Sequence, residues 1–158
     1  SKTLAPGYRV GWIAPGKYYE QVKQIKLFHA MSCPAITAEA IAWFLETNRY
    51  DRHLHKMRDI LQTNAQRFIN TIGEYFPPGT RVSRPRGGLV LWIELPPPAN
   101  TMRLYEAAMK EKISIAPGRL FTLQDQFNNC FRVNYALPWN EKTEMALRTL
   151  GRLAAKCS

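Results

Sequence analysis

The chain lacks long hydrophobic runs and paired-cysteine motifs. No window of its 158 residues approaches the roughly eighteen consecutive apolar residues of a membrane span. The opening residues also lack the apolar core of a secretory signal peptide. Cys33, Cys130 and Cys157 are odd in number and widely spaced, with no Cys-x-x-Cys pattern and no histidine-containing metal pattern. These absences predict a cytoplasmic protein with no membrane span, no disulfide framework and no metal site.

Acidic residues are also scarce. The 12 Asp and Glu residues face 22 Lys and Arg residues, which gives a formal net charge of +10. An excess of this size favours anionic partners, namely nucleic acid, phosphate groups or carboxylate ligands, but the charge alone does not indicate which of them binds. The composition, 46% hydrophobic, is that of a globular chain able to bury one sizeable core. The chain has no initiator Met and opens directly in a site-like motif, so we expect further sequence upstream.

Hydrophobic periodicity predicts several helices and short strands along the chain. Apolar residues recur at spacings of three and four in the predicted helices, and the longest of these has roughly seven turns. The helices are expected over 18–29, 36–44, 51–75, from about 101, and over 141–155. The strands are expected over 8–14, 81–83, 89–95, 113–115 and 130–136, with turns at the Pro- and Gly-containing stretches 77–79, 86–88, 96–98 and 116–118.

This order of elements indicates the fold class. Helices come first, and short strands mixed with two helices follow. We therefore predict an α/β chain that ends in a small α+β domain, with a long connecting helix and a sheet of three or four mostly antiparallel strands backed by helices.

The most informative segment runs from Ser1 to Trp12 and reads Ser-Lys-Thr-Leu-Ala-Pro-Gly-Tyr-Arg-Val-Gly-Trp. It resembles the Schiff-base lysine segment of fold-type-I pyridoxal-phosphate enzymes, and specifically of a large aminotransferase subgroup. The resemblance implies that Lys2 carries pyridoxal 5'-phosphate covalently, as the catalytic lysine, and that Arg9 binds the cofactor. A lysine suited to this role needs a depressed pKa, and an arginine fork suits a phosphate. The plainer interpretation is a terminal surface lysine and a snorkelling strand arginine, but the joint match over twelve positions favours the cofactor site.

A second segment, from Asn129 to Pro138, reads Asn-Cys-Phe-Arg-Val-Asn-Tyr-Ala-Leu-Pro and follows a stretch Ile-Ala-Pro-Gly-x-x-Phe that ends at Phe121. In the same family, an arginine in a Phe-Arg-hydrophobic-Asn context resembles the group that binds the substrate α-carboxylate. The resemblance therefore implies that Arg132 binds substrate. A bidentate contact of this kind fixes the amino acid against the cofactor. The plainer alternative is an ion-paired or solvated strand arginine.

The middle of the chain extends the resemblance. The segment from Tyr50 to Arg58 resembles the basic start of the long helix in the MocR subgroup of GntR-type transcription regulators, and the segment from Pro85 to Trp92 is similar to a strand-turn unit shared with free-standing aminotransferases. The MocR proteins join an N-terminal winged-helix DNA-binding domain to an aminotransferase-like domain. The resemblance implies that residues 1–48 belong to a large cofactor-binding domain. Residues 49–158 would then be the connecting helix and small C-terminal domain of a pyridoxal-phosphate-dependent transferase fold.

Three functions follow as hypotheses. The first is the cofactor- and effector-sensing part of a DNA-binding regulator, whose effector is an amino acid or an amine. The second is part of a free-standing aminotransferase, and the third is a basic binding module without a cofactor. For the first two, the family implies a homodimer, and it implies that several cofactor contacts lie upstream of Ser1, so we expect this chain alone to be inactive as an enzyme.

Overall fold

The computed structural model describes residues 3–30, 32–47 and 49–157. The chain divides into two compact units, Ser1–Met57 and Arg58–Ser158. The division falls inside one long helix, nine residues after the boundary at 48/49 that the sequence led us to expect, and that expected boundary remains a prediction.

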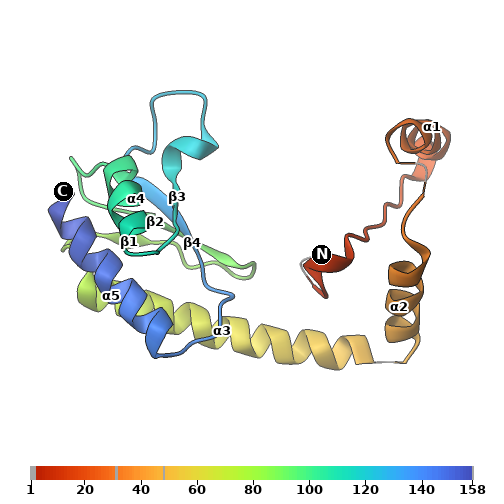
Figure 1. Ribbon diagram of the computed structural model, residues 1–158, viewed down its shortest axis with the longest axis horizontal. Coiled ribbons are helices and arrows are strands. Elements are labelled where there is room, and N and C mark those ends of the chain that lie inside the picture. Colours follow the sequence, from red (N-terminus) through yellow and green to blue (C-terminus); the bar gives the residue numbers. More distant parts are fainter. Residues whose placement is uncertain (1–2, 31, 48, 158) are drawn as a thin grey trace. The chain divides into compact units, whose positions relative to one another are not determined.

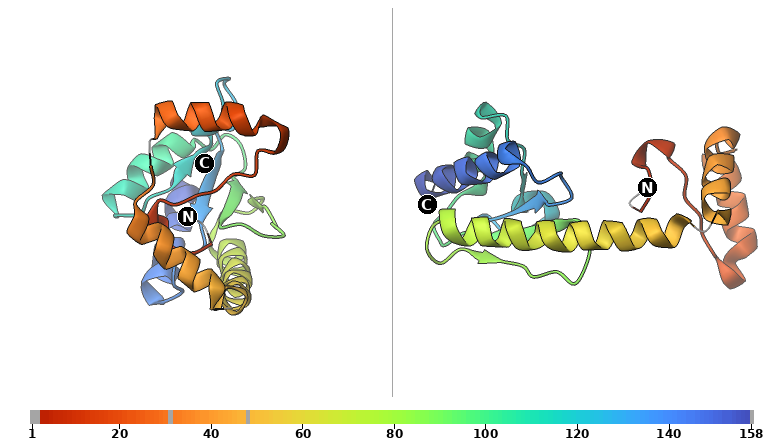
Figure 2. Two further views of the ribbon diagram at one scale, coloured as in Figure 1. Left: turned by 90° about the vertical axis from the view of Figure 1, so that its right-hand side faces the viewer. Right: turned by 90° about the horizontal axis from the view of Figure 1, so that it is seen from below.

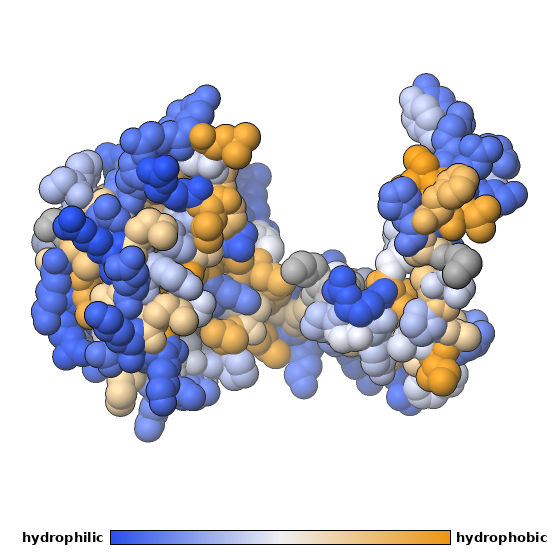
Figure 3. Space-filling view, turned by 45° about the horizontal axis from the view of Figure 1, so that its top comes forward, coloured by the Kyte–Doolittle hydropathy of each residue, from blue (hydrophilic) through white to orange (hydrophobic). Residues whose placement is uncertain are grey.

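The first unit consists of short helices joined by irregular backbone. Its elements are the 3-10 helices η1 (Pro6–Tyr8) and η2 (Gly16–Tyr18), the helices α1 (Tyr19–His29) and α2 (Ala35–Glu46), and the start of α3 (Arg49–Tyr75). None of the residues described between Thr3 and Met57 is buried. Large apolar side chains such as Phe28 and Ile36 are 84% and 85% exposed, and Figure 3 shows hydrophobic side chains at the surface of this unit.

The strand expected over Tyr8–Ala14 is wrong. Pro6 opens a 3-10 turn, Arg9 adopts a left-handed conformation with φ of 52°, and residues 9–15 have no regular structure. Alternating apolar residues form a strand only where a neighbouring strand accepts their hydrogen bonds. No such neighbour lies in the described part of this unit.

The second unit contains a four-stranded antiparallel sheet, which confirms the predicted architecture. Its strands have the order β1-β2-β4-β3, and each neighbouring pair is antiparallel. The elements are the remainder of α3, β1 (Arg81–Val82), β2 (Val90–Glu94), α4 (Thr101–Lys110), β3 (Ala116–Pro117), the 3-10 helix η3 (Gly118–Phe121), β4 (Cys130–Asn134) and α5 (Glu141–Lys156) (Figure 1).

The third strand lies later in the sequence than the periodicity predicted. Ile113 to Ile115 form no strand, and the pairing residues are Ala116 and Pro117, which align with Arg132 and Phe131 of β4. Ile115 is instead buried in the core. The strand ends after Pro117 because η3 begins at the next residue, Gly118.

Three helices cover one face of this sheet. In β2 the buried Leu91 and Ile93 alternate with more exposed residues, and Phe131 and Val133 do the same in β4. These inward-facing side chains join α3, α4 and α5 in one hydrophobic core. Figure 2 shows α5 alongside the C-terminal half of α3. The other face of the sheet therefore remains without a helical layer in this unit.

Local signals in the sequence explain where the helices begin and end. Asn100 and Asn140 accept hydrogen bonds from backbone N–H groups in the first turns of α4 and α5, which is typical of N-cap residues. Pro77, Pro78 and Gly79 follow α3 closely and prevent its continuation. Within the described ranges, no helix is both long enough and apolar enough to cross a membrane.

Candidate functional site

The candidate site lies on the face of the sheet that the helices leave uncovered. Trp92 of β2 and Arg132 of β4 are direct partners in the strand register, and their side chains share this face. Arg132 also aligns with Ala116 of β3 on its other side. Because Arg132 lies on an inner strand with a small residue beside it, its long side chain rises from the middle of an open surface.

Arg132 is exposed, and an aromatic ring is its neighbour. Its guanidinium carbon lies over the ring of Phe121, 4.5 Å from the ring centroid. In the part of the chain that the structure describes, none of the ion pairs involves Arg132. The group therefore keeps its positive charge available for an anion. Of the two plainer alternatives, an ion pair is not found among the described residues, and a solvated strand arginine is consistent with the exposure of Arg132.

Three aromatic side chains form a cluster beside this arginine. Trp92 contacts Phe121 edge-on at 5.7 Å and Phe127 edge-on at 5.5 Å between ring centroids. Phe121 and Phe127 are 43% and 44% exposed. The surface beside Arg132 thus combines one unneutralised cation, which suits a ligand carboxylate, with a cluster of partly exposed aromatic rings next to it.

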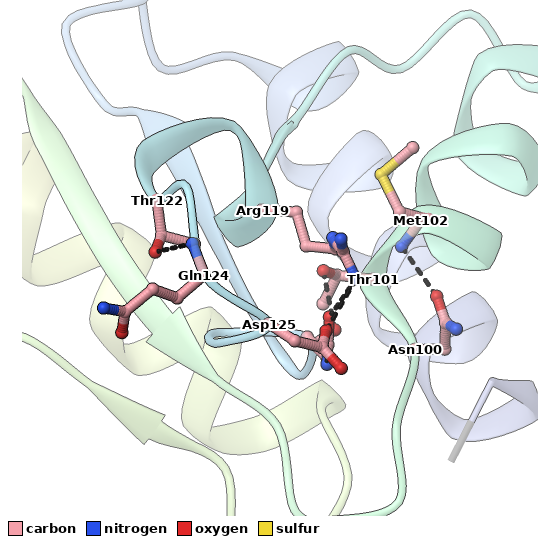
Figure 4. Close-up of polar contacts among 8 residues, drawn as sticks. Asn100, Thr101, Met102, Arg119, Thr122, Gln124 and Asp125 are labelled. Atoms are coloured by element: carbon pink, nitrogen blue, oxygen red, sulfur yellow. Dashed lines mark hydrogen bonds and ion pairs between the residues drawn. The ribbon is translucent and has the colours of Figure 1, made fainter.

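The segment that carries both phenylalanines is held by polar contacts at its base. Arg119 donates to the carboxylate of Asp125 at 2.6 Å (Figure 4). Asn128 donates to the same oxygen at 2.9 Å. The buried Thr101 hydroxyl, at the start of α4, lies 2.9 Å from the carbonyl oxygen of Asn128 and 2.8 Å from that of Cys130. This segment is therefore tied to the body of the unit by several polar contacts.

Two acidic side chains on this side of the unit are paired with other arginines. Glu94 shares the face of Trp92 on β2, but it pairs with Arg81 across the strand at 3.7 Å. Asp125 pairs with Arg119 at 2.6 Å. Two carboxylates that could otherwise compete for Arg132 thus have their own arginines.

The cofactor segment lies in the other unit. Lys2 falls outside the described residues, so its role stays a prediction. Arg9 is exposed and takes part in none of the ion pairs found among the described residues. Arg9 belongs to the first unit and Arg132 to the second.

One histidine joins the lysine segment to the start of α3. The ring nitrogen Nε2 of His53 lies 2.8 Å from the backbone oxygen of Thr3, and the ring of Phe44 packs edge-on against it at 6.0 Å. The sequence indicated only a surface histidine here. No group of three or more potential metal ligands occurs among the described residues.

The sequence alone did not reveal the aromatic cluster beside Arg132. Phe121 and Trp92 lie inside family-like segments, but no role was predicted for Phe121, Trp92 or Phe127. Their proximity depends on how the segment after β3 folds back. The only local signal is Gly118, at the point where that segment approaches its own far end.

The comparisons with known proteins agree on one protein family. The family model "Aminotransferase class I and II" matches residues 1–150. The chain is 38% identical over 151 residues to the uncharacterized HTH-type transcriptional regulator YjiR of Escherichia coli, covering 96% of this chain and 32% of that protein. It is 36% identical over 153 residues to a second uncharacterized HTH-type regulator, YdcR, covering 97% and 33%.

A solved structure with a similar fold is LysN, the α-aminoadipate aminotransferase of Thermus thermophilus, complexed with N-(5'-phosphopyridoxyl)-L-leucine. Its TM-score is 0.89 at 26% identity, with 99% of this chain and 40% of that chain covered. The chain thus spans about a third of the length of the regulators it matches.

Proposed function

The chain belongs to the class I and II aminotransferase family, and we propose that it is the C-terminal part of a pyridoxal-phosphate-binding domain that senses an effector in a DNA-binding transcription regulator. The relatives YjiR and YdcR, both HTH-type regulators, support this proposal. They are about three times longer than the region matched, which leaves room for a separate DNA-binding domain.

The observation that carries the proposal is the state of Arg132. An exposed guanidinium on an open sheet face, with its carbon over the ring of Phe121 and no acidic partner among the described residues, can bind a carboxylate. We propose that it binds the carboxylate of an amino acid effector. A bidentate contact would set the orientation of that ligand, because the planar fork of arginine matches both carboxylate oxygens.

The residues near the start of the chain suit the cofactor. We propose that Lys2 is the point of covalent attachment and that Arg9, exposed and unpaired in the described part of its unit, binds the phosphate. When bound, the cofactor supplies an aldehyde and an electron-withdrawing ring. The contributions of this chain are then anion binding by Arg9, ligand orientation by Arg132 and amine chemistry at Lys2.

The proposed regulation is a population shift. An effector that binds one arrangement of the parent protein better than another moves the equilibrium toward it by the difference in binding free energy. In this proposal the parent is a cytoplasmic homodimer that contacts DNA through an N-terminal winged-helix domain. The effector is an amino acid or amine.

A second candidate is a free-standing amino acid aminotransferase. The likeness to LysN over 99% of the chain favours it. Lys2, Arg9 and Arg132 would then have the same ligands, and Lys2 would in addition move a proton to and from the substrate Cα. A third candidate is a basic module without cofactor, for which the net charge of +10 is the only support.

Two experiments separate these candidates. The complete protein is loaded with pyridoxal phosphate, reduced with borohydride and digested, and the phosphopyridoxyl group is located by mass spectrometry. We expect stoichiometric labelling at Lys2 and none at any other lysine, and loss of the label in Lys2→Ala. Labelling scattered over surface lysines would refute both cofactor-dependent functions. If Lys2 is labelled, a gel-retardation assay distinguishes the other two functions. Specific retardation of operator DNA that changes when an amino acid is added would favour the regulator over the enzyme.

A further inference from the structure

We propose that Phe121 is the positioning residue of Arg132, so that its ring fixes the guanidinium in the orientation that accepts a ligand carboxylate. This inference rests on the proposed function, in which Arg132 binds that carboxylate. Phe121 itself makes no contact with the ligand in this proposal. It acts through the arginine.

The geometry of the contact supports this role. The guanidinium carbon lies 4.5 Å from the ring centroid of Phe121, within the distance of about 6 Å over which a cation is attracted to an aromatic face. The N–H groups of a guanidinium point outward in its own plane. The face of Phe121 attracts the cation and offers no oxygen acceptor, so the N–H groups remain available for a carboxylate.

An aromatic ring is also the kind of support that does not compete with the ligand. A carboxylate placed at the same position would fix Arg132 equally well, but it would occupy the donors and neutralise the charge. Phe121 carries no formal charge, and the acidic Glu94 and Asp125 pair with Arg81 and Arg119. Arg132 is thus oriented and still unneutralised within the described surface.

Phe121 is itself held by neighbouring rings. Trp92, the direct strand partner of Arg132, contacts the ring of Phe121 edge-on at an angle of 70°. Phe127 packs against the same indole at an angle of 89°. Trp92 is only partly exposed and lies on an inner strand, so it provides a fixed base for both rings.

The path of the backbone brings these rings together. Phe121 ends η3, which follows directly after the two residues of β3 that pair with Arg132 and Phe131. Phe127, at the far end of the same segment, has φ of 59° and lies against Gly118. The aromatic contacts of Phe121 and Phe127 and the Arg119–Asp125 ion pair thus all stabilise the same loop, residues 118–127.

The test compares replacements that keep the aromatic face of Phe121 with replacements that keep only its bulk. Phe121→Tyr retains the ring, whereas Phe121→Leu and Phe121→Met retain apolar volume without a π face. Calorimetric titrations use the complete cofactor-loaded protein with L-alanine, L-leucine and L-phenylalanine, each paired with its primary amide. The ratio of the two dissociation constants, amide over acid, reports the carboxylate contact alone.

We expect Phe121→Tyr to keep the wild-type ratio and Phe121→Leu and Phe121→Met to lower it by about two- to fivefold, the strength of one exposed cation–π contact. Phe127→Leu is the matched control, because it makes the same replacement in the same loop without removing the ring under Arg132. Its ratio should stay within about twofold of the wild type. Thermal unfolding of each variant identifies any that fail to fold, and the two non-aromatic replacements give independent chances of a folded protein.

The possible failures are distinguishable. If Arg132→Lys leaves the ratio unchanged, the carboxylate role of Arg132 is wrong, and the inference about Phe121 is refuted with it. If Arg132→Lys lowers the ratio but both non-aromatic variants keep it, the proposed function survives and only the positioning role is refuted. An equal loss in Phe127→Leu would likewise refute it, because loop stability would then explain the effect.

Discussion

Gly118 approaches Phe127 so closely that a side chain at position 118 does not fit. A Cβ atom there would lie 2.7 Å from the Cβ of Phe127 and 2.8 Å from the backbone oxygen of Cys130. Both distances are shorter than real Cβ contacts, and the second neighbour is backbone. The loop that carries Phe121 therefore depends on glycine at its first residue.

The first prediction concerns this contact. Gly118→Ala should destabilise the protein by about 1–3 kcal/mol, because the backbone of the loop must shift to admit the methyl group. Gly87→Ala is the matched control, since an added Cβ there meets nothing within 4 Å. We expect it to be neutral or to stabilise by up to about 1 kcal/mol. Urea unfolding curves of the two variants and the wild type make the comparison, and equal midpoints for both variants would contradict the prediction.

The sequence predicted the helices and most of the sheet because those elements depend on local patterns. Apolar residues of α3 recur at spacings of three and four over many turns, and the alternation in β2 and β4 matches one buried and one open face. Such patterns need only the sequence and the expectation of a core. The helix predicted over 51–75 accordingly differs from α3 by two residues at its start.

The errors occurred where tertiary contacts decide the structure. The segment 9–15 has a strand-like pattern but pairs with no strand in the described part of its unit, and β3 is shifted to the residues that can reach β4. For the site, the sequence pointed to Arg132 as a family-like arginine. It could not show that Phe121 lies under its guanidinium, because that contact depends on the folded path of residues 118–127.

The second prediction concerns a buried amide. Asn64 of α3 is 4% exposed and donates from Nδ2 to the backbone oxygens of Tyr135 and Leu137, at 3.3 and 2.9 Å. Asn64→Ala removes both bonds and leaves two carbonyl groups without this donor, so we expect a loss of about 1–3 kcal/mol in the free energy of unfolding.

Gln66 provides the control for Asn64. Its amide donates to Asn70 on the exposed surface of the same helix, and Gln66→Ala should change stability by less than about 0.5 kcal/mol. Both variants are measured by urea unfolding followed by circular dichroism. A loss in Gln66→Ala as large as in Asn64→Ala would contradict the prediction, because the buried link to the end of β4 would then not be the cause of the effect. Helix propensity cannot cause such a loss, since alanine is the better helix former in both replacements.

The third prediction concerns Arg132. Arg132→Lys keeps the positive charge but removes the planar fork, so an amino acid ligand should bind about tenfold more weakly, the cost of one charge-assisted hydrogen bond. Binding of the corresponding amide should change little. Arg81→Lys, on the same sheet and paired with Glu94, is the control and should leave both affinities unchanged. Calorimetry on the complete protein decides, and equal losses for acid and amide would contradict a carboxylate contact.

The last prediction concerns the buried thiol of Cys130. Burial, and to a lesser degree the charge of Glu94, raises the pKa of this thiol above its usual value of 9.0. The unfolded chain then loses this proton at a lower pH than the folded chain. The resulting contribution to stability is complete below about pH 9 and is lost as the pH rises through the folded pKa.

Two measurements test this assignment. Iodoacetamide at pH 8 should modify the exposed Cys33 first, the half-buried Cys157 more slowly, and the buried Cys130 only after unfolding in urea. In urea unfolding at pH 8 and pH 10, Cys130→Ala should lose less stability between the two pH values than the wild type, whereas Cys33→Ala should lose as much. The comparison between variants is necessary because burial also raises the pKa of Tyr135, which adds its own alkaline loss to every variant. If Cys130→Ala and the wild type lose stability equally between pH 8 and pH 10, the thiol is not the group responsible.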